Sequence, residues 1–206
     1  MDPGKLITIE GIDGAGKSTL AVGLGRALGA RGIAVQLLRE PGGVRAAERI
    51  RKLVSDPEQH IGTRAEALLY AAARAQLVEE ALRPLLSDGT WVLLDRFVDS
   101  SLAYQGGGRQ LGVDAVREIN EFAIQGLRPD RTLLLVIDPA DGRARSQARG
   151  GPPDRLENEQ RDFFDRTAAA YRTLAEQEPG RIRTIDASQP TTDVLKAAMT
   201  AISDLL

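Results

Sequence analysis

Gly11-Ile12-Asp13-Gly14-Ala15-Gly16-Lys17-Ser18 decides the fold of this chain. The stretch satisfies the pattern G-x-x-x-x-G-K-[ST], in which backbone amides of a glycine-rich loop converge on phosphate groups. The apolar run at residues 6–10 predicts a buried strand before the loop, and residues 19–31 predict a helix after it. A helix N-terminus adds its partial positive charge to such a site. The sequence therefore predicts a strand–loop–helix unit that binds a nucleoside triphosphate.

Three side chains supply the chemistry that such a loop needs. Lys17 is predicted to reach the β- and γ-phosphates, and the hydroxyl of Ser18 is predicted to ligate Mg²⁺. Asp95 ends the apolar run 91–94, so it emerges at the carboxyl edge of a parallel sheet, where a carboxylate organises the metal directly or through water. Asp138 is the alternative candidate for the carboxylate that organises the metal, because it also ends an apolar strand. Pro139 directly after it favours a role in a structural turn instead.

Composition bounds the class of protein. The 206 residues include 27 Lys and Arg against 29 Asp and Glu, a net charge of −2, which argues against a broad nucleic-acid-binding face. There is no Cys and a single His, His60, in a polar segment that we interpret as a solvated loop, so disulfides and a His-cluster zinc site are excluded. We expect one domain over residues 1–206. No signal peptide and no membrane-spanning apolar run is apparent, so the expected location is cytoplasmic.

Apolar runs alternate with helical patterns along the chain, which is typical of a parallel sheet with helices on both faces. The predicted strands are 6–10, 33–38, 91–95, 132–138 and 182–186. The predicted helices are 19–31, 44–54, 64–87, 113–125, 158–177 and a last one that starts at Pro190. The aromatic side chains of 158–177 recur at helical spacing, so we predict that they belong to the core.

One segment breaks the alternation. Residues 142–155 carry Arg143, Arg145, Arg149 and Arg155 around Gly150-Gly151-Pro152-Pro153. We expect this segment to form a mobile surface loop over the phosphate site, at about 142–156, and call it the lid segment. An arginine that such a loop delivers to a transferring phosphoryl group can contribute ~10³-fold or more in rate.

Further motifs follow the phosphate loop in a fixed order. They are Arg39-Glu40-Pro41-Gly42-Gly43, where Pro41 is a candidate for a cis peptide bond, Tyr70-Ala71-Ala72-Ala73-Arg74-Ala75-Gln76, the run from Asp95 to Gly106, Ala148-Arg149-Gly150 with Asp154-Arg155-Leu156-Glu157, and Ile185-Asp186-Ala187-Ser188-Gln189-Pro190. With Glu10 and the loop itself, this set resembles the bacterial thymidylate kinase family over nearly the whole chain.

The resemblance implies a fold and a reaction. The fold is α/β, a three-layer α/β/α P-loop kinase fold with a five-stranded parallel sheet in the order 2-3-1-4-5. The reaction transfers the γ-phosphoryl group of ATP to dTMP and gives ADP and dTDP in dTTP synthesis, with Mg²⁺ as cofactor. The resemblance also implies a homodimer that packs through helices, with no nucleic-acid polymer and no membrane as partner.

The resemblance further implies a role for individual residues. The implied ATP-binding residues are Gly11, Ile12, Asp13, Gly14, Ala15, Gly16, Lys17, Ser18, Thr19 and Arg143. The implied dTMP-binding residues are Asp13, Glu40, Pro41, Arg51, Tyr70, Arg74, Arg96, Ser101, Tyr104 and Gln105. The implied catalytic residues are Asp13, Lys17, Asp95, Arg96 and Arg149, and the implied metal ligands are Ser18 and Asp95.

Among the implied dTMP-binding residues, the family pattern assigns a binding role at each end of the nucleotide. Asp13 resembles the carboxylate that contacts the sugar 3′-hydroxyl, and Arg51 and Arg96 resemble the cations that hold the acceptor phosphate. Arg74 resembles the residue that donates a hydrogen bond to a thymine carbonyl. Tyr70, one turn earlier, resembles the aromatic residue that stacks on the base, and Tyr104 resembles the residue that crowds the 2′ position. Core packing of the two tyrosines, and a solvated charged helix face for Arg51, remain the alternatives.

The sequence departs from the family pattern at the loop and the lid segment. Gly14 stands where some members carry a basic residue, so the lid arginines become the candidates for the catalytic cation, with Arg149 first, Arg155 second and Arg145 third. Gly150-Gly151-Pro152-Pro153 is one residue longer than the usual spacing, which leaves the choice among them open.

Other functions compete with this interpretation. A kinase for a different nucleotide or deoxynucleoside is the nearest rival, and a paralogue that only binds nucleotide is another. A GTPase-type switch is disfavoured, because the chain has no Asn-Lys pair to begin the guanine-binding motif.

Overall fold

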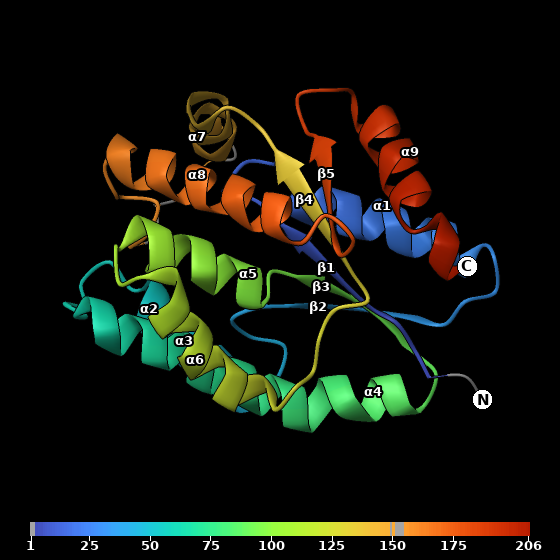
Figure 1. Ribbon diagram of the computed structural model, residues 1–206, viewed down its shortest axis with the longest axis horizontal. Coiled ribbons are helices and arrows are strands. Elements are labelled where there is room, and N and C mark those ends of the chain that lie inside the picture. The colour runs from blue at the N-terminus through green and yellow to red at the C-terminus, as the bar shows by residue number, and fades with distance from the viewer. Residues whose placement is uncertain (1–2, 149, 151–154) are drawn as a thin grey trace.

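A parallel sheet runs through the middle of the molecule (Figure 1). The computed structural model describes residues 3–148, 150 and 155–206. Within these residues the sheet has five strands in the order β2-β3-β1-β4-β5, each parallel to its neighbours. The strands are β1 Leu6–Glu10, β2 Val35–Arg39, β3 Trp91–Asp95, β4 Arg131–Val136 and β5 Ile182–Asp186. The predicted strands and the strand order are confirmed.

Helices connect the strands. They are α1 Lys17–Gly29, α2 Arg45–Ser55, α3 Thr63–Leu77, α4 Arg83–Ser87, α5 Val98–Ser101, α6 Val113–Ile124, α7 Pro139–Ala148, α8 Arg161–Gln177 and α9 Thr191–Ala201. The π-helical turn η1 Val78–Leu82 joins α3 to α4, η2 Leu102–Gly108 extends α5, and the 3₁₀ turn η3 Ser203–Leu205 follows α9. The helix predicted over 64–87 is therefore one continuous helical run.

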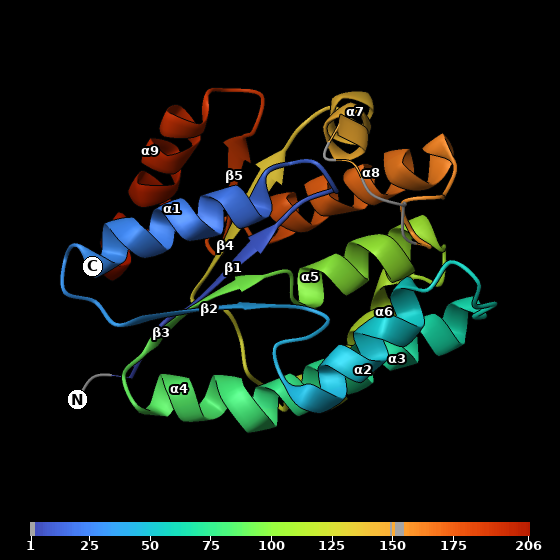
Figure 2. The same ribbon diagram turned by 180° about the vertical axis from the view of Figure 1, so that it is seen from behind.

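Alternate residues of each strand face two separate cores, because successive side chains of a strand point to opposite faces. Ile7, Ile9 and Leu93 pack with α1 and α9 on one face of the sheet. Leu6 and Leu94 pack on the other face with residues of α3, α6 and α8. Figures 1 and 2 show the resulting three layers from opposite sides, as the resemblance implied.

The aromatic side chains of the predicted helix 158–177, which is α8, lie in the second core. Phe163 and Tyr171 of α8 are buried there, and the rings of both meet Tyr104 of η2 edge to face, at centroid separations of 5.9 and 6.3 Å. The prediction that these side chains are core is confirmed. Because η2 packs so closely on α8, the helix that follows β3 is held rigidly above the carboxyl edge of the sheet.

The expectation of a loop from residue 142 onward was wrong for residues 142–148, which belong to α7. Asp138 caps this helix, since its Oδ1 accepts the backbone N–H of Ala140 at 2.8 Å, and arginine and alanine are strong helix formers. Gly142 is the buried residue of α7, and Arg143 and Arg145 add contacts from the helix to Phe164 and to the carbonyl oxygen of Ala187. Arg149 and residues 151–154 of the lid segment lie outside the described residues.

The α5–η2 segment at residues 98–108 was not predicted as helical. Gly106, Gly107 and Gly108 end it, and three consecutive glycines disfavour a helix in an isolated chain. Packing explains their presence: a Cβ on Gly107 would lie 2.6 Å from Cβ of Ala170, and one on Gly108 would lie 2.7 Å from the ring of Phe163. None of the helices in the described residues is long and apolar enough to cross a membrane.

Candidate active site

The phosphate loop joins the carboxyl end of β1 to the first turn of α1, as predicted. Gly11 has φ +134°, and a Cβ there would lie 2.5 Å from the carbonyl oxygen of Leu135 in β4. Gly14 has φ +80°, and a Cβ there would lie 1.9 Å from the carbonyl oxygen of Gly142 in α7. Glycine is therefore required at both places, and the second contact seats α7 directly against the loop (Figure 2).

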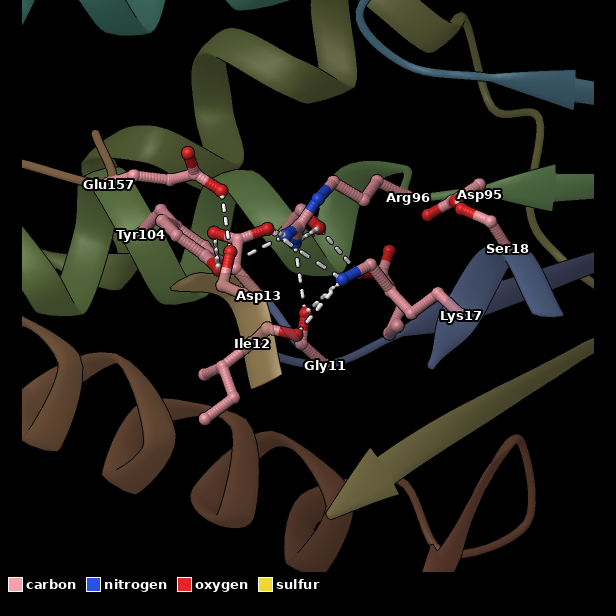
Figure 3. A network of polar contacts seen from close by, with 12 residues as sticks. Gly11, Ile12, Asp13, Lys17, Ser18, Asp95, Arg96, Tyr104 and Glu157 are labelled. Atoms are coloured by element: carbon pink, nitrogen blue, oxygen red, sulfur yellow. Dashed lines mark hydrogen bonds and ion pairs between the residues drawn. The ribbon is translucent and has the colours of Figure 1, made fainter. Parts of the chain in front are cut away.

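Lys17 lies along the inside of this loop. Its Nζ donates to the carbonyl oxygens of Gly11 at 3.1 Å and Ile12 at 3.0 Å and lies 4.0 Å from a carboxylate oxygen of Asp13 (Figure 3). Burial and the charge of Arg96 lower the pKa of Lys17 to about 8, against the opposing charge of Asp13. The ammonium group is therefore still mostly protonated at neutral pH and is held where a phosphate chain would enter.

Ser18 and Asp95 meet at the first turn of α1. The hydroxyl of Ser18 donates to Oδ2 of Asp95 at 2.7 Å, which brings the end of β3 beside the loop as predicted (Figure 3). A hydroxyl next to a carboxylate is a donor set that fits Mg²⁺, which keeps several waters and takes further ligands from substrate phosphates. Within the described residues no group of three or more His, Cys, Asp or Glu could hold a metal by itself.

Asp13, Arg96 and Tyr104 form a compact polar cluster beside the loop (Figure 3). Arg96 donates to Oδ1 of Asp13 at 2.6 Å and to the carbonyl oxygen of Gly11 at 3.0 Å, and the hydroxyl of Tyr104 donates to the other oxygen of Asp13 at 3.1 Å. Burial alone would raise the pKa of Asp13, but the charges of Arg96 and Lys17 outweigh it and lower the pKa to about 2. Asp13 is therefore an anion at any working pH.

A pocket opens beside this cluster. It is lined by all ten residues that the resemblance implied for the acceptor, namely Asp13, Glu40, Pro41, Arg51, Tyr70, Arg74, Arg96, Ser101, Tyr104 and Gln105. These residues come from the loop, the β2–α2 turn, α2, α3 and the segment after β3, so the fold gathers them at the carboxyl edge of the sheet. Their individual roles stay predictions. Ser55, Ser100 and Leu156 also line the pocket and were missed.

Arg51 differs from the other cations of its helix. It is half-buried and donates to the carbonyl oxygen of Pro41 at 2.9 Å, whereas Arg45, Arg49 and Lys52 are exposed. The Glu40–Pro41 peptide bond is cis, as the sequence suggested. The geometry favours a position for Arg51 in the pocket wall over a solvated helix face, and its role at the acceptor phosphate stays a prediction.

Arg74 is the largest fully buried side chain of the pocket wall. Its Nε donates to Glu40 at 2.7 Å, Nη2 donates to the carbonyl oxygen of Phe97 at 2.9 Å, and Nη1 donates to Ser101 at 3.0 Å and to Asn120. Every guanidinium nitrogen thus has a partner within the protein, which fixes the orientation of Arg74 in the pocket wall. Burial raises the pKa of Glu40 to about 7 despite the nearby charge of Arg74.

The lid arginines take different positions. Arg155, the second choice for the catalytic cation, turns away to Glu66 at 2.7 Å and to the carbonyl oxygen of Val54 at 2.9 Å. Arg145, the third choice, donates to the carbonyl oxygen of Ala187 at 2.9 Å. Arg143 is exposed and lines a second cavity with Ile12 and Asp13 of the loop. Arg149, the first choice, lies outside the described residues.

Glu10 is a functional candidate that sequence reasoning did not assign. It is fully buried at the end of β1 and accepts hydrogen bonds from the backbone of Phe97 at 2.7 Å, from Ser100 at 2.5 Å and from Tyr171 at 2.9 Å. Burial, with the charge of Asp99, raises its pKa. Because Ser100 also accepts from Arg96 at 3.2 Å, Glu10 fixes the turn that carries Arg96. An acid in the last position of a buried strand was the available signal.

Comparison with known proteins gives one consistent result. The profile of the family described as thymidylate kinase matches residues 9–198. A thymidylate kinase of Rhizorhabdus wittichii is 46% identical over 206 residues, which is 99% of this chain and 99% of the relative. One from Deinococcus radiodurans is 45% identical over 204 residues (99% and 98%), and one from Lactobacillus delbrueckii subsp. bulgaricus 45% over 199 residues (95% and 94%).

Proposed function

The chain belongs to the thymidylate kinase family, and on that premise we propose that it transfers the γ-phosphoryl group of ATP to dTMP, giving ADP and dTDP. The observation that carries the proposal is the pocket beside the phosphate loop, whose lining combines the cations Arg51, Arg74 and Arg96 with the polar and aromatic side chains of Tyr70 and Gln105. A pocket of this kind suits a nucleoside monophosphate, because the arginines bind its phosphate while aromatic and amide groups bind its base.

The donor side rests on the loop and the first turn of α1. The backbone amides of the loop and Lys17 hold the β- and γ-phosphates, with Thr19 and Arg143 at the border of the site. Lys17 leaves the carbonyl oxygens of Gly11 and Ile12 for the phosphates, and a partner of higher charge strengthens these bonds. Ser18 and Asp95 would hold Mg²⁺, which would neutralise charge on the phosphates.

On the acceptor side, Arg96 and Arg51 hold the phosphate of dTMP in front of the loop. Asp13 orients the sugar 3′-hydroxyl and keeps Arg96 in place through the 2.6 Å ion pair. The acceptor phosphate oxygen is already ionised at neutral pH, so no general base is required. Catalysis then consists of aligning two anions and neutralising their charge, with Lys17 and Arg96 as fixed cations.

A lid arginine supplies the remaining charge, and we propose Arg149 for it. Arg145 is bound to the carbonyl oxygen of Ala187 and Arg155 is paired with the buried Glu66, which supports this choice over both. We propose that residues 1–206 act as one domain in which the lid segment closes over ATP and excludes water. The cytoplasm, where Mg²⁺ and ATP are available, is the location that suits this reaction.

We also propose that the protein is a homodimer. Phe122 of α6 has 89% of its surface exposed and Leu68 of α3 has 55%, and α3 and α6 are packed against each other. Large exposed apolar side chains on neighbouring helices mark protein interfaces. Light scattering should give twice the mass of the chain, and Phe122→Glu should shift it to the monomer, whereas a wild-type monomer at all concentrations would contradict the proposal.

The decisive experiment is an acceptor panel. ADP release with ATP and Mg²⁺ is measured with dTMP, dUMP, dCMP, dGMP and thymidine in turn. We expect dTMP to give the highest kcat/KM. A higher value for another nucleotide or for thymidine would identify the rival kinase, and nucleotide binding without transfer to any acceptor would identify a binding protein.

A further inference from the structure

Glu66 of α3 is completely buried, yet it lies outside the phosphate loop and outside the wall of the acceptor pocket. Its Oε1 accepts from Nε2 of Gln105 at 2.9 Å and from Nε of Arg109 at 3.2 Å. Its Oε2 accepts from Nη2 of Arg109 at 3.1 Å and pairs with Nη1 of Arg155 at 2.7 Å. One of these partners, Gln105, lines the acceptor pocket, so Glu66 contacts a pocket residue without lining the pocket itself.

The charges around Glu66 keep it ionised. Burial alone would raise its pKa, but hydrogen bonds from Arg109, Gln105 and Arg155 and the charge of Arg109 outweigh burial and lower the pKa. Arg109 is itself fixed, since it also pairs with Glu159 at 2.5 Å and lies 4.9 Å above the ring of Phe163. An ionised carboxylate is an acceptor only. The group that faces it from Gln105 must therefore be the NH₂ end of the amide.

This restriction determines what Gln105 presents to the pocket. Rotation of a glutamine amide by 180° exchanges a donor for an acceptor, and the two ends are otherwise nearly equal in size. With NH₂ held by Glu66, the opposite end is the carbonyl oxygen Oε1. Thymine and uracil carry a donor, N3–H, on the edge where cytosine carries a bare acceptor nitrogen. A pocket that offers a carbonyl oxygen to this edge accepts the first two bases and repels the third.

We propose that Glu66 is a specificity-determining positioning residue: it holds the amide of Gln105 so that its carbonyl oxygen accepts the N3–H of the acceptor base, which selects thymine and uracil against cytosine. The inference rests on the proposed function, since it assumes a pyrimidine monophosphate in this pocket. In this proposal Arg109 and Arg155 keep the carboxylate of Glu66 ionised. Arg155 therefore serves the base end of the site and not the transferring phosphoryl group.

The test replaces Glu66 by glutamine, which keeps the size but can donate as well as accept, so that the amide of Gln105 is free to turn. The ratio of kcat/KM for dTMP over dCMP is measured for wild type and Glu66→Gln. Sites built to hydrogen-bond a substrate N–H reject analogues that lack it by large factors. We expect the ratio to fall by ~10-fold or more, while the ratio of dTMP over dUMP, which both carry N3–H, stays within about twofold of wild type.

Asp99→Asn is the matched control, because Asp99 is an equally buried carboxylate that Arg181 binds through two nitrogens, at 2.7 and 2.9 Å, away from the pocket wall. It should lower the melting temperature without changing either ratio. An unchanged dTMP/dCMP ratio in Glu66→Gln, or an equal fall in Asp99→Asn, overturns the inference.

A second variant covers the case in which Glu66→Gln does not fold. Gln105→Leu removes the carbonyl oxygen and leaves the pairs between Glu66 and the two arginines in place, and it should lower the dTMP/dCMP ratio to the same extent. A ratio that survives this change also overturns the inference. Failure of the proposed function looks different, since wild-type protein would then not phosphorylate dTMP at all.

Discussion

Asp13 of the phosphate loop and Arg96, which follows β3, are joined by an ion pair of 2.6 Å. The pair links a residue of the donor-binding loop to a cation of the acceptor pocket. Arg96 has φ +72°, a conformation that a residue with a side chain rarely adopts, and it is held there by Asp13, Gly11 and Ser100. The ion pair therefore connects the two halves of the active site directly.

Replacing Asp13 by Asn should disconnect these halves. The amide keeps the shape but loses the charge that holds Arg96, so we expect kcat/KM for dTMP to fall by ~10²-fold while the KM for ATP changes little. The pKa of Asp13 is about 2, lowered from 3.8, so its contribution to stability is fully present above about pH 4 and is lost as the pH falls toward 2. Steady-state kinetics with each substrate varied in turn provide the check, and an equal loss for both substrates would contradict the expectation.

Lys17→Ala should abolish transfer and leave the fold intact. The ammonium group of Lys17 is bound to carbonyl oxygens of the loop and is the fixed cation there, and we expect its loss to affect phosphate binding more than folding. We expect kcat to fall by ~10²-fold or more, with an unchanged circular dichroism spectrum. Lys5→Ala, which removes an exposed lysine paired with Asp130, is the control and should keep full activity. Substantial transfer by Lys17→Ala would count against the whole scheme.

Arg149→Ala tests the proposed catalytic arginine. If Arg149 acts on the transferring phosphoryl group, kcat falls by ~10³-fold and the dissociation constant of dTMP, measured by calorimetry, stays close to wild type. Arg145→Ala is the comparison, because Arg145 is bound to the carbonyl oxygen of Ala187, and we expect a smaller change in kcat. A larger loss in Arg145→Ala would transfer the role to that residue.

Gly14→Ala should disturb the seat of α7 on the phosphate loop. The new Cβ would lie 1.9 Å from the carbonyl oxygen of Gly142, in addition to the cost of φ +80°. Gly32→Ala has the same φ of +80° and nothing within 4 Å, so it isolates the conformational cost alone. We expect Gly32→Ala to cost ~1 kcal/mol of stability and Gly14→Ala to cost more and to raise the KM for ATP. Equal melting temperatures for the two variants would be the contrary result.

Glu40 predicts a dependence of stability on pH. Burial raises its pKa from 4.5 to about 7, so between these values the folded protein binds a proton that the unfolded chain does not. Stability from this group is therefore present at low pH and declines as the pH rises from about 4.5 to 7. Arg74, which binds the charged form, and Glu10, which disfavours it, are the charged groups acting on Glu40.

The measurement is thermal unfolding of wild type and Glu40→Gln across pH 5 to 8. Glutamine cannot ionise, so the melting temperature of the variant relative to that of wild type should rise up to about pH 7. Above about pH 7 the difference between the two should stay constant. A difference that stays flat between pH 5 and 7 would show that Glu40 titrates near its ordinary value.

Sequence alone determined the fold class and the place of the phosphate loop between β1 and α1. The phosphate loop consists of adjacent residues, so their chemistry follows from their spacing, and apolar runs fix buried strands wherever they fall in the chain. Strand order and the composition of the acceptor pocket came from the resemblance, and the structure bears out the order and brings the predicted residues together.

Only the tertiary structure decided how those residues are supported. Arg74 meets Glu40 and Asn120 across 34 and 46 positions, and Gln105 meets Glu66 across 39, so no local pattern could pair them. Helix α7 likewise formed where Gly and Pro nearby suggested a loop, because Asp138 caps its start and Gly142 seats it on Gly14. The physical reason is the same in each case: spacing along the chain specifies local conformation and burial, while partners that are distant in sequence are selected by the packing of helices on the sheet.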